Sequence, residues 1–166
     1  MRRYFLTIAL PLLLLSAAHA ADDDALLAQL LTCNPSPDHR IRTTMMKSLE
    51  ARSTPDGDGR AKISGRIQVG KLCIENAQLT GSFGVLMASG SMCDGEPASL
   101  ADFLKQTKSD LKPAGAALPP HVLAAFEAPK YSMALYRGEP GFDFAPPDPA
   151  SKHLSYFCAF QESGPQ

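Results

Sequence analysis

The stretch AKISGRIQVGKLCIENAQLTGSFGVLMA, residues 61–88, decides the fold. Apolar residues recur in it at every second position, as Ile67 and Val69 do. Because alternate side chains of a β-strand point to the same face, this period predicts half-buried strands. Gly70-Lys71 and Thr80-Gly81 interrupt the pattern and mark turns. The segment therefore predicts a three-stranded antiparallel meander.

Further strands are expected toward the C-terminus. The alternation resumes at Phe83, which we place inside the third strand, and the glycine-rich residues 89–95 are expected to turn the chain out of the sheet. Residues 131–136 and 154–160 are short runs rich in apolar and aromatic side chains. Each predicts one more strand, which gives a sheet of about five strands.

The N-terminal part of the chain has helical patterns instead. Residues 22–31 begin with three aspartates, which favour a helix N-terminus as caps and through the helix dipole. Residues 37–52 carry Ile41, Met45 and Leu49 at a spacing of four, which predicts a helix with these three side chains in the core.

Two helices are also expected in the central part of the chain. Residues 99–111 begin with a capping-box-like pattern, and residues 120–127 form a shorter apolar run. Helices followed by strands, a helix and further strands indicate an α+β fold with an antiparallel sheet, packed by the N-terminal and central helices.

The first twenty residues have the pattern of a secretory signal peptide. Arg2-Arg3 forms a basic start, residues 6–15 form a short apolar region, and Ala18-His19-Ala20 offers small residues at a cleavage site. An N-terminal membrane anchor is the alternative, but the apolar run is shorter than the ~20 residues that a spanning helix needs. We expect a mature chain of one soluble domain, residues 21–166, in the periplasm or outside the cell.

The charge balance argues against some partners. The full chain has 16 basic and 17 acidic residues; without Arg2 and Arg3 the balance is 14 against 17, a net charge of −3. A chain with this balance has no basic field to attract nucleic acid. The sequence also predicts no membrane span after removal of the signal.

Four cysteines follow the predicted signal peptide. An even number of cysteines in an exported chain indicates disulfides, here two, and sequence alone allows three pairings. We favour Cys73–Cys93, which closes a local loop, together with Cys33–Cys158, which ties the N-terminal helices to the last strand. A metal site is the alternative, but the chain has no C-x-x-C pair and its histidines are widely spaced. No metal or cofactor is predicted.

Catalytic motifs are weak in this sequence. Residues 109–112 match S-x-x-K, but the other motifs of enzymes that use this pair are missing. His121 and His153 lie at element boundaries, where a lone histidine is more often a surface residue than a general base. If an enzyme site exists, Ser109, His121 and His153 are its candidates.

The loop around residues 138–147 carries the clearest binding signal. Phe142 and Phe144 lie on a proline-rich segment, where they could anchor a partner at little entropic cost. The alternative is that both rings pack against the protein's own sheet.

Taken together, these features favour a small exported disulfide-linked protein that acts by binding a partner in the cell envelope. An inhibitor of an envelope enzyme, or an immunity protein against a toxin, would fit this class. The alternatives are a periplasmic enzyme with an unrecognised site, and a module that binds a small ligand or has a structural role in the envelope.

Overall fold

The computed structural model describes residues 11–93, 112–113, 117–120, 122–142 and 150–161. These residues form two helices and nine strands, and the fold is α+β as the sequence predicted. The elements are α1 (Pro11–Leu31), α2 (His39–Arg52), β1 (Ser53–Pro55), β2 (Ala61–Ile63), β3 (Ile67–Val69), β4 (Leu72–Ser82), β5 (Val85–Met92), β6 (Lys112–Pro113), β7 (Val122–Ala128), β8 (Tyr131–Arg137) and β9 (Leu154–Gln161).

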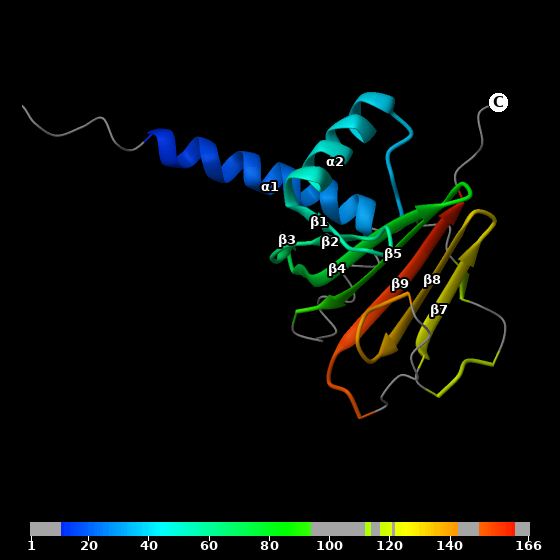
Figure 1. Ribbon diagram of the computed structural model, residues 1–166. Helices are drawn as coiled ribbons and strands as arrows, with labels where there is room; N and C mark the ends of the chain where they lie inside the picture. Colours follow the sequence, from blue (N-terminus) through cyan, green and yellow to red (C-terminus); the bar gives the residue numbers. More distant parts are fainter. Residues whose placement is uncertain (1–10, 94–111, 114–116, 121, 143–149, 162–166) are drawn as a thin grey trace, which may run out of the picture.

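All strands belong to one antiparallel sheet. Eight of them follow the order β1-β2-β4-β5-β9-β8-β7-β6, and β3 pairs with β4 beside this path. The last strand, β9, lies between β5 and β8, with Cys158 opposite both Ala88 and Met133. The strand nearest the C-terminus therefore joins the two halves of the sheet (Figure 1).

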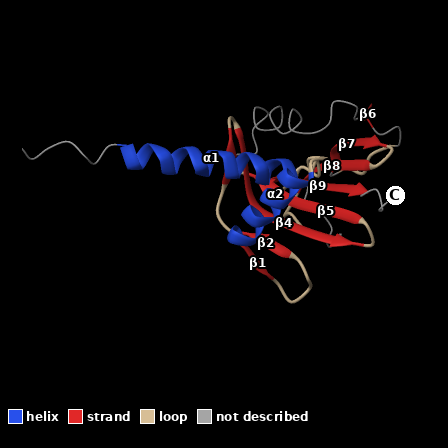
Figure 2. Ribbon diagram, turned by 90° about the horizontal axis from the view of Figure 1, so that it is seen from above, coloured by secondary structure: helices blue, strands red, loops and turns tan. Residues whose placement is uncertain are grey.

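The helices lie together on one side of the sheet (Figure 1). The C-terminal half of α1 is the part that enters the core, where Leu27, Ala28 and Leu31 are completely buried. The first turns of α1 instead extend beyond the sheet, as both Figure 1 and Figure 2 show. None of the helices in the described residues is long and apolar enough to span a membrane.

Helix α2 agrees with its predicted segment and buries Met45 and Leu49. Asp38 caps it, since its side chain accepts from the backbone N–H of Arg40 at 2.7 Å. Ile41 differs from the prediction, because its side chain is 40% exposed. Ile41 belongs to the first turn of α2, and of the three apolar residues spaced by four only Met45 and Leu49 reach the core.

Three predictions that concern the sheet were wrong in detail, and the sheet has more strands than the approximately five expected. Residues 122–128 form β7 rather than a helix, because the segment pairs along its length with β8 through a tight hairpin. Residues 89–92 continue β5, since Ser89 and Ser91 pair with β9. Gly81 also lies within a strand, opposite Leu86. The predicted helix over residues 99–111 lies outside the described residues.

Two disulfides stabilise this fold, and they join the pairs that the sequence favoured. Cys33 is bonded to Cys158 with a Cα–Cα distance of 6.0 Å, and Cys73 to Cys93 with 5.4 Å. The first attaches the end of α1 to the central strand β9. The second connects the start of β4 to the residue after β5, at the open end of the β4–β5 hairpin.

Helix α1 ends in a Schellman motif, in which Asn34 N–H donates to the Gln29 carbonyl at 3.1 Å and Cys33 N–H to the Leu30 carbonyl at 3.0 Å. Cys33 occupies the left-handed position of this motif, with φ 54°. Glycine is the usual residue there because it has no Cβ. Cys33 therefore combines its disulfide to Cys158 with a backbone conformation that cysteine disfavours.

Candidate functional site

The tip of the β4–β5 hairpin is the most unusual surface feature of the described residues. Ser82 pairs with Val85, so only Phe83 and Gly84 form the loop. Both have positive φ, 51° and 74°, which is the signature of a type I′ turn. We call residues 82–85 the hairpin tip; it lies beside the end of β9, because Val85 pairs with Gln161 (Figure 1).

Phe83 is a poor residue for this position on two grounds. Type I′ turns favour Asn, Asp or Gly at the first loop position, because a bulky side chain in the left-handed region costs roughly 1–2 kcal/mol. The ring of Phe83 is also fully exposed, with a relative exposure of 104%. Phe83 thus contributes no burial energy, and its left-handed backbone conformation is unfavourable. The stability of the fold therefore does not explain its presence.

The hairpin that carries Phe83 is firmly held. The Cys73–Cys93 disulfide and a backbone bond from Cys93 N–H to the Cys73 carbonyl, 3.1 Å, close its open end. Strand β5 is also paired along most of its length with β9. The tip is thus a short turn on a rigid base, which lowers the entropy lost when its residues make a contact.

Phe142, a candidate contact residue from the sequence, lies against the protein itself. Its ring meets Phe157 of β9 edge to face at a centroid distance of 6.1 Å. The Arg60 guanidinium carbon lies 5.4 Å from the centroid of the same ring. These contacts support the alternative in which Phe142 fixes its loop to the sheet. Phe144 lies outside the described residues.

Of the three candidate enzyme residues, His153 is the one that lies within the described part of the chain. Ser109 and His121 lie outside the described residues. His153 Nε2 is 3.7 Å from Glu139 Oε1, in an exposed pair. The nearby Ser155 hydroxyl is completely buried and donates to the Gly138 carbonyl at 2.6 Å. A buried hydroxyl that is used in this way is a structural group and offers no accessible nucleophile.

The exposed turn at residues 56–60 uses the carboxylate of Asp56 for its own hydrogen bonds. Asp56 Oδ1 accepts from the N–H groups of Asp58 and Arg60 at 3.0 and 3.1 Å. Desolvation alone would raise the pKa of Asp56, but these bonds and the Lys62 ammonium lower it overall. Within the described residues no three His, Cys, Asp or Glu side chains are grouped so that they could hold a metal ion.

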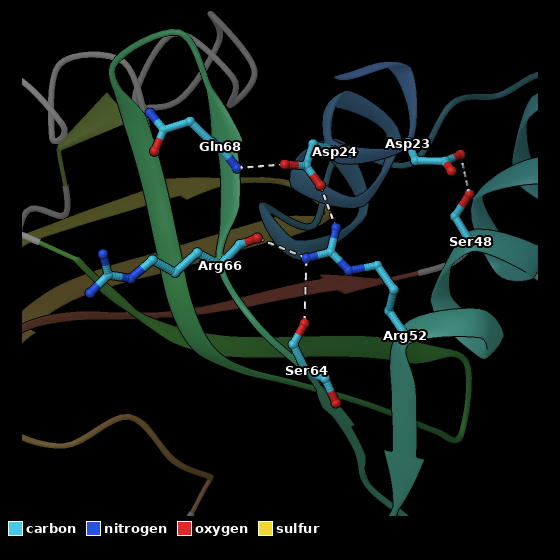
Figure 3. A network of polar contacts seen from close by, with 7 residues as sticks. All are labelled: Asp23, Asp24, Ser48, Arg52, Ser64, Arg66 and Gln68. Atoms are coloured by element: carbon cyan, nitrogen blue, oxygen red, sulfur yellow. Dashed lines mark hydrogen bonds and ion pairs between the residues drawn. The ribbon is translucent and has the colours of Figure 1, made fainter. Parts of the chain in front are cut away.

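A second polar cluster fixes α1 to the rest of the fold (Figure 3). Asp24 accepts from the Arg52 guanidinium and from the backbone N–H of Gln68, the latter at 2.8 Å. The other guanidinium nitrogen of Arg52 donates to the Arg66 carbonyl at 2.8 Å. Asp23 accepts from the Ser48 hydroxyl at 2.9 Å. Because every group has a partner within the protein, the cluster has a structural role.

Replacing Asp24 by Asn tests this role. The change removes the charge of the pair and leaves one oxygen to serve both Arg52 and Gln68, so we expect the free energy of unfolding to fall by about 1–2 kcal/mol. Urea unfolding measures it. Asp58→Asn, on an exposed turn, is the matched control and should change stability by less than about 0.5 kcal/mol. Equal effects of the two substitutions would contradict the structural role.

Comparisons with known proteins give no assignment: no family model matches the chain, and no curated protein or solved structure shows significant similarity to it. The function therefore has to be argued from the chain's own residues. The sequence patterns missed Phe83 as a site residue because it fits the alternation of a strand. The glycine that follows it was the available signal, since Gly favours the second position of a two-residue turn.

Proposed function

We propose that this chain is an exported, disulfide-linked binding protein whose contact point is the hairpin tip. The observation that carries the proposal is Phe83: a fully exposed aromatic side chain in a disfavoured backbone conformation on a rigid turn. Aromatic residues are enriched among the few side chains that supply most of the energy of protein interfaces. A contact with a partner would bury the ring and offset its cost.

Export of the chain is part of the proposal. Disulfides persist in oxidising compartments, and the two in this fold involve all four cysteines of the sequence. The position of α1 is compatible with removal of residues 1–20. Its first turns extend away from the sheet, and the polar contacts to α2 and β3 begin at Asp23 and Asp24. Cleavage before Ala21 would leave these contacts in place.

The role that fits these features best is inhibition of an envelope enzyme or neutralisation of a toxin. A rigid, protruding contact residue binds with little loss of conformational freedom, which suits a protein that must block its target tightly. The partner class is an envelope protein, and the proposal needs no metal or cofactor.

The experiment is a comparison of the native exported protein with its Phe83→Asn variant in affinity capture from the cell envelope. We expect the native protein to retain a stoichiometric protein partner, and the variant to lose it. Leu123→Asn is the control, because Leu123 is 48% exposed on β7, away from the tip. Retention of no partner by the native protein would overturn the proposed function.

A further inference from the structure

The shape of the hairpin tip restricts the kind of surface that it can contact. Two strands converge on a loop of two residues, in which Phe83 lies between Ser82 and Gly84, and Gly81 precedes Ser82 in β4. At Gly84 nothing lies within 4 Å of the place where a Cβ would be, and at Gly81 the nearest atom, the Val85 carbonyl oxygen, is 3.9 Å away. The single large side chain of the tip is thus surrounded by space rather than by other side chains.

We propose that Phe83 enters a concave apolar pocket of a partner protein, such as the substrate cleft of an envelope enzyme. This inference rests on the proposed function. On a flat partner surface only the outermost atoms of the protruding ring would make contact, so most of the ring would stay exposed to water. In a pocket the whole ring is desolvated, and the ring then supplies the energy of a central anchor residue.

A lipid bilayer and a second copy of this chain are less suitable contact partners for the hairpin tip. A lipid bilayer is a weak partner for one aromatic ring, since stable membrane attachment requires a second apolar or basic element, and the loop residues Phe83 and Gly84 carry no charge. A second copy of this chain would have to offer the pocket itself. Within the described residues, the other large exposed apolar side chains are those of Ile41, Met46, Leu118 and Leu123, each 40–48% exposed. They lie on α2, on a loop and on β7, and apolar residues scattered singly in this way are ordinary surface residues.

The loop conformation prepares Phe83 for this contact. A type I′ turn fixes the backbone of both loop residues, so the direction of the Cα–Cβ bond of Phe83 is set before binding. The Cys73–Cys93 disulfide fixes the other end of the same hairpin. Less backbone conformational entropy is then lost on binding, so more of the free energy gained by burying the ring contributes to affinity.

Photocrosslinking from position 83 tests the inference in the intact cell envelope. The full chain carries p-benzoylphenylalanine in place of Phe83 or, as control, in place of Leu123. We expect an adduct with a single protein from position 83, at a yield about tenfold or more above that from position 123. The crosslinked residues of that protein should be apolar and line a cleft. With the captured partner, Phe83→Ala should weaken binding about thirtyfold or more, and Leu123→Ala less than twofold.

The other outcomes separate this inference from the proposed function. An adduct to lipid, to a second copy of the chain, or to a flat surface of the partner would overturn the pocket. If native protein and Phe83→Ala capture a partner equally well, the pocket and the hairpin tip as contact point are both overturned, and only a binding function through another surface stands. If the native protein captures no partner and position 83 gives no adduct, both the inference and the proposed function fail.

Discussion

Removal of the Cys33–Cys158 disulfide is expected to lower the free energy of unfolding by about 2–5 kcal/mol. The two cysteines are 125 residues apart in sequence, so the bond restricts a large part of the unfolded chain. In the native protein it joins the end of α1 to the central strand β9, and both residues are completely buried. The measurement is urea unfolding of Cys33→Ala/Cys158→Ala under oxidising conditions. A loss below about 1 kcal/mol would contradict it.

The left-handed conformation of Cys33 supplies a matched control. In Cys33→Gly/Cys158→Ala the bond is also absent, but glycine adopts φ 54° without steric cost. This variant should be more stable than the double-alanine variant by about 1 kcal/mol. Equal stability of the two would contradict the left-handed conformation of residue 33.

Introduction of a side chain at Gly90 is expected to have the second-largest effect. A Cβ built there would lie 3.0 Å from a ring carbon of Tyr156 and 3.1 Å from Ile74. Both neighbours are fully buried and have little room to move. We expect Gly90→Val to lower the free energy of unfolding by about 3 kcal/mol, and Gly90→Ala by less, because overpacking of a core increases with the volume added.

Gly57→Ala is the control for this series. Gly57 lies in an exposed turn, where nothing is within 4 Å of an added Cβ, and it has no positive φ. The free energy of unfolding of Gly57→Ala should differ from that of the native protein by less than about 0.5 kcal/mol. Urea unfolding measures it for all variants of the series. If Gly90→Val unfolded no more easily than Gly57→Ala, the close packing of the Tyr156 ring on Gly90 would be wrong.

Local patterns predicted much of this fold, and long-range pairing accounts for the errors. The spacing of Met45 and Leu49 identified α2, and the alternation around Ile67 identified the hairpin strands, because both patterns reflect local geometry. Residues 122–128 became a strand because β8 pairs with them, which no periodicity within seven residues reveals. The central place of β9 depends on partners far away in sequence, so the order of the strands was beyond local patterns.

The candidate site was missed for a different physical reason. Phe83 satisfies the alternation of a strand, and an aromatic residue there has a high strand propensity. The site is recognised because a bulky residue occupies a turn position that requires positive φ. This becomes visible only from the strand register, which pairs Ser82 with Val85 and leaves Phe83 in the loop. Phe142 had the stronger sequence signal, but its ring contacts Phe157 and Arg60 of the same chain.

The central claim is that Phe83 is present for contact with a partner and at a cost to the fold. The most direct measurement is the free energy of unfolding of Phe83→Asn relative to the native protein. Because Asn-Gly is the preferred sequence of a type I′ turn, we expect the variant to be more stable by about 1 kcal/mol. A loss of stability of similar size would contradict the claim and assign Phe83 to the structure of the hairpin.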